Sequence, residues 1–308
     1  TRGRYEIMGL LTLVSRNCKM FFKDKGMFFT SLITPAILLF LYVTFLGKTY
    51  NNFLTSSMPE GFAVDDGLTD AVVGGQLISS ILAVCCVTVA FCSNLLMVQD
   101  KITGSKYDLT MTPVKNSILS MSYFLATTIA TLIICMTALV ICMGYLGVVG
   151  WYISVGDVLL IILDVVLLVL FGTALSSLVN APLSTSGQCS AVTTVISAGY
   201  GFICGAYMPI SNFGEGLQRV LSFLPGTYGT SLLRNQVLAG VFGEMTSQGV
   251  PPEVVENIKD ALDCNLYFFG EKVGAGTMYV ILIASVVGLI GLYVLYNARK
   301  AGKKTSTH

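Results

Sequence analysis

Charged residues are scarce in this sequence, and their scarcity excludes most soluble folds. Asp, Glu, Lys and Arg make up 11% of the 308 residues, whereas a typical soluble domain carries about 25%. A soluble chain of this length could not cover its surface with so few charges, so we expect the membrane to be its main solvent. The formal net charge of +1 gives no electrostatic support for binding nucleic acid.

Histidine and the common catalytic motifs are also missing. The one histidine is His308, and no HExxH sequence occurs, so we expect no metal site and no catalytic residues. No GxxxxGK[ST] phosphate-binding loop occurs either, so we expect this chain to bind no ATP and no other cofactor. Most of the nine cysteines lie in apolar runs, which favours a packing role over a disulfide or metal role.

Long apolar runs are what the sequence has instead. Six of them reach the length of about 20 residues that a helix needs to cross a bilayer. They fall at roughly 26–47, 72–97, 117–143, 155–179, 189–209 and 277–297. The expected fold class is therefore an all-α integral membrane protein, with six transmembrane helices in a domain that covers residues 26–298.

The basic residues gather on one predicted side of the membrane. Most of them lie before the first run, in the loop 98–116 between the second and third runs, and in the tail 299–308. Most acidic residues fall on the other side, including Glu60, Asp65, Asp66, Asp70, Glu253, Glu256, Asp260 and Asp263. The positive-inside rule then predicts a multi-pass protein of the cell membrane with both termini in the cytoplasm.

Three segments outside the runs have patterns of their own. Residues 1–25 carry apolar residues at helical spacing with Arg16 and Lys19 on the other face, which predicts an amphipathic helix in the membrane interface; a plain basic flank is the alternative. Residues 211–240 are apolar but too broken to span, which favours a re-entrant segment. Residues 241–275 form an extracytoplasmic insert, with packing on the outer surface favoured over a substrate lid.

Two motifs stand out along the chain. The loop 99–115 contains Asp100, Gly104-Ser105, Leu109 and Thr112-Pro113-Val114, with Pro113 nine positions after Gly104. The second motif follows the fifth run and consists of Pro209, Leu221, Leu224-Pro225-Gly226-Thr227-Tyr228, Leu233-Arg234 and Gly240. With these motifs, and over essentially all six runs, the chain resembles the permease subunits of type V-like ABC-2 exporters. It departs from the family pattern at Lys106-Tyr107, where Leu-Glu is usual, and at Leu224, where Asn is usual.

The resemblance implies a half-permease that works with partners. These would be a second permease subunit, taken as identical, two copies of a separate ATPase that bind ATP and Mg²⁺, and the surrounding membrane lipid. The positions that match the family's ATPase-coupling region are Arg16, Lys19, Asp100, Gly104, Ser105, Leu109, Thr112 and Pro113. The positions that match its outer gate are Pro209, Leu221, Pro225, Tyr228 and Arg234.

The predicted spans suggest a transport pathway and a dimer contact. Uncharged polar residues that could line a pathway are Thr34, Gln76, Ser80, Thr194 and Tyr200. Such walls would suit an amphiphilic or apolar solute such as a drug, an antibiotic, a peptide or a lipid-linked molecule. Ser197, Gly201 and Gly205 repeat every four residues, which could form a dimer seam or equally a close contact within one subunit.

Asp164 supports a different hypothesis. It is an acidic residue inside the fourth run, and an acid within a membrane span is a functional candidate by default. An ion-coupled secondary carrier that uses Asp164 is therefore one alternative, and a non-catalytic membrane sensor is another. A structural role for Asp164 is favoured over both, because apart from Asp157 at the outer edge of the fourth run the spans contain no second acid, lysine or histidine with which to form a relay.

Overall fold

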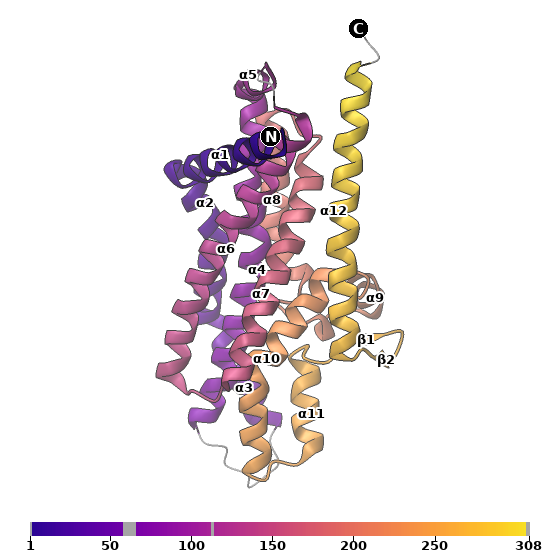
Figure 1. The fold of residues 1–308 in the computed structure, drawn as a ribbon. Helices are drawn as coiled ribbons and strands as arrows, with labels where there is room; N and C mark the ends of the chain where they lie inside the picture. Colours follow the sequence, from indigo (N-terminus) through magenta and orange to yellow (C-terminus); the bar gives the residue numbers. More distant parts are fainter. Residues whose placement is uncertain (1, 58–65, 112–113, 306–308) are drawn as a thin grey trace.

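Long helices packed around a central helix, α4, make up the fold (Figure 1). The structure is a computed structural model that describes residues 2–57, 66–111 and 114–305. Helix α4 spans Asp66–Ile102 and contacts α2, α6, α7, α8 and α10. It is apolar around most of its circumference, as expected of a helix that is covered on all sides. The prediction of a largely helical membrane protein is confirmed.

Five segments are long and apolar enough to cross a membrane, and they match five of the six predicted runs. The first, Lys25–Asn52, combines α2 (Lys25–Leu41), the π-helix η1 (Tyr42–Leu46) and part of α3 (Gly47–Ser57). The second is Gly67–Ile102 within α4, and the third and fourth are α6 (Asn116–Val149) and α7 (Val155–Asn180). The fifth is Ala275–Arg299 within α12 (Ala275–Thr305).

The remaining predicted run coincides with α8, which spans Ser186–Ile203. This helix of 18 residues is not among the five apolar segments, and Gln188 with several hydroxyl-bearing residues and glycines lowers its hydropathy. It also ends earlier than predicted, because Gly205 adopts a left-handed backbone with φ of 71° and turns the chain. The six-span count therefore stays a prediction.

The two ends of the bundle carry different elements. Helix α1 (Arg2–Lys23), the short helix α5 (Ser105–Met111) and the end of α12 lie at one end (Figure 1). Helix α3, the second half of α10 (Pro225–Ser247) and α11 (Pro252–Ala261) lie at the other end. The start of the first helix and the end of the last helix thus lie at the same end of the bundle.

The predicted re-entrant segment consists of three helical pieces. They are the 3-10 turn η2 (Ile210–Asn212), α9 (Glu215–Leu221) and α10, which begins with Pro225 in its first turn. The predicted boundary at residue 240 falls inside α10. A two-stranded antiparallel hairpin of β1 (Tyr267–Phe268) and β2 (Glu271–Lys272) follows α11, so the chain is nearly but not entirely α.

Candidate functional site

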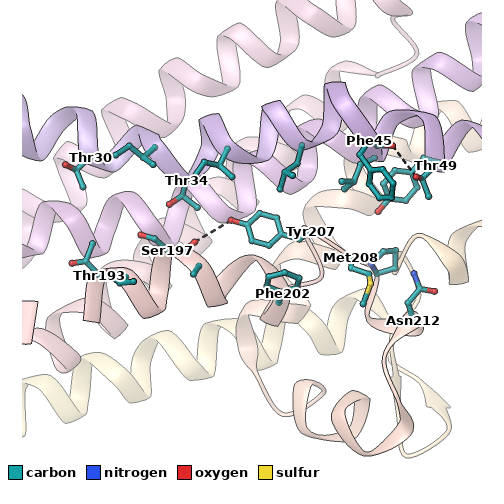
Figure 2. A pocket seen from close by; sticks show the side chains of 18 of the residues that line it. Thr30, Thr34, Phe45, Thr49, Thr193, Ser197, Phe202, Tyr207, Met208 and Asn212 are labelled. Atoms are coloured by element: carbon teal, nitrogen blue, oxygen red, sulfur yellow. Dashed lines mark hydrogen bonds between the residues drawn. The ribbon is translucent and has the colours of Figure 1, made fainter. Parts of the chain in front are cut away.

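A groove of about 860 Å³ runs between α2–α3 on one side and α8 with its following turn on the other (Figure 2). None of the residues that line it is charged. They are Thr30, Ile33, Thr34, Ile37, Leu41, Phe45, Leu46, Thr49, Tyr50, Thr193, Thr194, Ser197, Ala198, Phe202, Tyr207, Met208, Pro209, Asn212 and Ala261. A groove of this volume is within the range of sites for small molecules.

The polar side chains of the groove come from facing helices. Thr30 and Thr34 of α2 lie opposite Thr193 and Ser197 of α8 (Figure 2). Helical residues four positions apart share a face, which is why each pair lines the same wall.

Several of these hydroxyls are already bonded within their own helices. Thr30 donates to the carbonyl of Gly26 at 2.7 Å, and Thr194 donates to the carbonyl of Ser190 at 2.8 Å. Thr49 does the same with the carbonyl of Phe45. The groove is therefore less polar than its residue types suggest, because these donors are used locally.

Tyr207 lies between the two walls. Its hydroxyl donates to the carbonyl of Ser197 at 3.4 Å, and its ring contacts Phe202 edge to face. The ring packs on Gly201 so closely that a Cβ there would lie 2.3 Å from it. In this subunit Gly201 thus serves an internal contact, and the dimer seam of Ser197, Gly201 and Gly205 stays a prediction.

Two of the five predicted pathway residues, Thr34 and Thr194, line the groove. The other three lie behind it: Gln76 donates to the Tyr50 hydroxyl at 3.5 Å, and Ser80 contacts the guanidinium of the α10 arginine, described below. The buried Tyr200 packs against Gly226 at the start of α10.

Sequence reasoning missed Tyr50, which lines the groove. The predicted first span ended at residue 47, although Tyr42 and Tyr50 are two helical turns apart and share a face.

A buried arginine connects four segments of the chain. Arg234 of α10 is 1% exposed, and it donates to the carbonyls of Leu262 at 2.6 Å and Gly205 at 3.0 Å. It also contacts the hydroxyl of Ser80 on α4 at 3.3 Å and lies 3.6 Å from the carboxylate of Asp263. The guanidinium thus connects α10, α4, the turn after α8 and the turn after α11.

Asp263 completes this junction. It accepts hydrogen bonds from the backbone N–H groups of Ile210 at 2.6 Å and Ser211 at 3.3 Å. Burial raises the pKa of Asp263, while Arg234 and the two N–H donors act in the opposite direction. Its φ of 55° belongs to the left-handed region, which Asp adopts more readily than most residues.

All five predicted outer-gate residues lie in this neighbourhood. Pro209 lines the groove, and Pro225 begins α10. Tyr228 donates to the carbonyl of Ser222 at 2.5 Å and packs with the buried Leu221. Together with Arg234, these residues connect the turn after α8 with α9 and the first half of α10.

A second charged cluster lies at the end of the bundle that carries α1. Arg16 donates to the two carboxylate oxygens of Asp100 at 2.6 and 3.3 Å, and the hydroxyl of Tyr123 donates to the same carboxylate at 2.5 Å. The hydrogen bond to Asp100 raises the pKa of Arg16. Asn17 bonds Ser122 at 3.4 Å, so α1 is fixed to both α4 and α6.

The structure divides the predicted coupling residues into buried and exposed groups. Asp100 is 2% exposed and serves as an internal partner of Arg16. Lys19 is exposed, while Gly104, Ser105 and Leu109 are half-buried. Thr112 and Pro113 lie outside the described residues.

The loop between α4 and α5 depends on a glycine. Gly104 has φ of 82°, a conformation that side-chain-bearing residues rarely adopt. This turn places Thr103, Tyr107, Asp108 and Met111 on the surface, where a soluble partner could contact them.

Asp164 is buried within the bundle and is 1% exposed. The hydroxyl of Tyr279 on α12 lies beside its carboxyl group, and Gln236 of α10 lies beside the same hydroxyl. Asp164 is not among the residues that line the groove. Among the described residues, neither carboxylate oxygen of Asp164 has a hydrogen-bond partner, and the Tyr279 hydroxyl has none either.

Comparison with known proteins identifies the family. A family model described as ABC-2 family transporter protein matches residues 51–293, which is most of the chain. No match was found among curated proteins. The matched region includes the groove wall from α8, the α4–α5 loop and the Arg234 junction, and it confirms the resemblance noted from the two motifs. The chain therefore belongs to the ABC-2 family of transporter proteins and is a membrane permease component.

Proposed function

We propose that the chain is one half of the membrane part of an ATP-driven exporter. Two copies would pair, and each would bind a separate ATPase subunit that carries ATP and Mg²⁺. In this proposal α8 is the fifth of six spans, and α9 with the start of α10 forms the re-entrant segment. The protein crosses the cell membrane, and both of its termini lie in the cytoplasm.

The lining of the groove supports an amphiphilic or apolar solute. Its lining offers apolar side chains and hydroxyls, many of them bonded locally, and no charged group. A strongly charged solute would lose its hydration there without compensation. An amphiphilic or apolar solute would bury apolar surface instead, with about 25 cal/mol gained per Å².

The end that carries α1 supports the proposal for coupling. Lys19, Tyr107 and Asp108 are exposed there, and the Arg16–Asp100–Tyr123 cluster anchors α1 to α4 and α6. If the ATPase displaces α1 or the α4–α5 loop, α4 would move with them, and α4 also contacts α8 and α10. This is a direct mechanical route from an ATPase to the groove and to the Arg234 junction.

A substitution on α8 tests whether solute uses the groove. Thr194 lines the groove, whereas its neighbour Val195 is exposed but is not a lining residue. We expect Thr194→Trp to fill part of the groove and to lower ATP-dependent transport by about tenfold or more, since a pocket discriminates strongly against added volume. Val195→Trp is the matched control and should transport normally.

The measurement is uptake of a fluorescent amphiphile into inverted vesicles that contain the permease with its ATPase. Equal transport by Thr194→Trp and Val195→Trp would show that solute passes elsewhere. ATP hydrolysis should continue in both variants, because neither position belongs to α1 or to the α4–α5 loop.

A further inference from the structure

Three phenylalanine rings form an exposed aromatic patch near the first turns of α12. Phe223 lies in the turn before α10, and Phe268 and Phe269 lie in the hairpin before α12. The three rings meet edge to face with centroids 5.2, 6.1 and 4.8 Å apart. Phe223 is 62% exposed and Phe269 is 67% exposed, so the patch is open to its surroundings.

Helix α9 extends the aromatic patch with an amphipathic face. Leu217 and Val220 are exposed, while Leu221 packs into the protein. Glu215 and Arg219 lie on the opposite side of the helix and pair with each other at 3.6 Å. At 100° per residue the apolar and charged side chains separate cleanly, which is the pattern of a helix lying in a membrane interface.

The contacts of α9 with α12 show how far along α12 the aromatic patch lies. Leu221, Leu224 and Phe213 share one hydrophobic cluster with residues of α12, including Tyr279 and Ile281. These two residues lie roughly 6 to 9 Å along α12 from its start at Ala275, given the rise of 1.5 Å per residue. Figure 1 likewise shows α9 and the hairpin beside the first turns of α12.

At this level α12 itself presents apolar side chains outward, among them Val280 and Ile283. These residues belong to the apolar stretch of α12 that is long enough to span a membrane. The aromatic patch lies beside the first turns of this stretch, and aromatic side chains are enriched at the membrane boundary, where such a stretch begins.

The hairpin backbone supports the outward placement of Phe269. This residue has φ of 50°, and Gly270 follows with φ of 90°. A bulky residue rarely adopts positive φ, so this turn holds the ring in the patch at a conformational cost.

We propose that the aromatic patch, with Leu217 and Val220, inserts into the leaflet that surrounds the first turns of α12. The ligand is the phospholipid bilayer itself. The patch then anchors two segments to the lipid: the turn that leads into α10 and its Arg234 junction, and the hairpin that leads into α12. The composition or packing of that leaflet can act on the start of α10 through Phe223.

A fluorescence measurement tests this insertion in the full-length chain. The sequence contains one tryptophan, Trp151, so Trp151→Phe gives a background without tryptophan. Phe269→Trp then reports on the patch, and Phe268→Trp repeats the measurement independently. Tyr267→Trp is the matched control, because Tyr267 precedes Phe268 on β1, points to the other face and bonds Asp260.

Each variant is reconstituted in phosphatidylcholine vesicles, and its tryptophan fluorescence is quenched in two ways. Phosphatidylcholine with brominated acyl chains quenches a tryptophan in the bilayer, and aqueous iodide quenches one in water. The measured quantity is the ratio of lipid quenching to iodide quenching. We expect this ratio to be higher for Phe269→Trp and Phe268→Trp than for Tyr267→Trp, by roughly fivefold for a ring at the membrane interface. A ratio for both patch variants that does not exceed the control ratio would overturn the proposal, since the patch would then face water or another protein.

Discussion

At the scale of single residues, buried charges with several partners hold the molecule together. Arg234 and Asp100 are each almost completely buried, and each is bonded by groups from more than one element. Removing one partner of a buried ion pair is costly, because the other charge stays buried without compensation. These residues should therefore matter more for stability than exposed charges of the same type.

Arg234→Met should destabilise the protein strongly. The substitution leaves Asp263 buried without its cation and leaves two backbone carbonyls without a donor, so we expect a loss of about 3–5 kcal/mol. Thermal unfolding in detergent measures this as a lower midpoint. Arg219→Met is the control, because Arg219 is exposed and its pair with Glu215 should contribute about 1 kcal/mol or less. Equal midpoints for the two variants would contradict the assigned role of Arg234.

Sequence motifs pointed to Arg234 and Asp100 but not to their partners. Asp263 lies beyond the end of α11, and Tyr123 lies on α6, after the short helix α5. Asp263 had been counted only as one of many acids on the predicted outer side. Such pairings depend on how the helices pack, and the local spacing of residues in the sequence does not determine this packing.

At the scale of elements, glycine sets how closely the central helices approach. A Cβ at Gly172 of α7 would lie 2.8 Å from the carbonyl oxygen of Cys86 and 3.0 Å from the Cα of Val87, both in the backbone of α4. The contact is between backbones, so no side-chain rotation can relieve an added methyl group. Small residues allow this kind of close packing between membrane helices.

Gly172→Ala should therefore push α7 away from α4. We expect a destabilisation of about 1–3 kcal/mol, which is typical of overpacking. Gly144→Ala on α6 is the control, since nothing lies within 4 Å of a Cβ there, and it should be neutral or stabilising by up to about 1 kcal/mol. The midpoints of thermal unfolding of the two variants measure this difference. If Gly172→Ala is as stable as Gly144→Ala, then α4 and α7 are not in close contact.

The docking of α1 makes a separate prediction. Arg16→Ala removes the charged hydrogen bonds to Asp100, each worth about 1.5–3 kcal/mol. Amide hydrogen exchange in α1 should then become roughly tenfold faster or more, because local opening costs less. Lys19→Ala lies one turn away on an exposed position and should leave exchange unchanged. Unchanged exchange in Arg16→Ala would mean that α1 is held by other contacts.

The helical elements could be predicted to very different degrees. Five apolar runs were found because length and hydropathy suffice for them, whereas α8 is shorter and richer in polar residues. The hairpin was missed because strands of two residues are too short to show an alternating pattern. Gly205 could have marked the end of α8, but a glycine in an apolar run also fits a helix contact.

At the scale of the whole molecule, three features lie along one path. The α1 cluster is at one end, the groove lies between α2–α3 and α8, and the Arg234 junction with the aromatic patch lies toward the other end. The sequence predicted Thr34 and Thr194 as lining residues, but it did not predict the groove as a whole. Its lining comes from residues 30–50, 193–212 and 261, which only the folded chain brings together.

The central claim is that a separate ATPase drives solute movement through this permease. The most direct test compares vesicles with the permease and its ATPase, supplied with ATP, against vesicles with the permease alone under a proton gradient. We predict transport of the fluorescent amphiphile only in the first case, with Asp164→Asn leaving that transport intact if the protein folds. Transport by the permease alone, abolished by Asp164→Asn, would contradict the account and support an ion-coupled carrier.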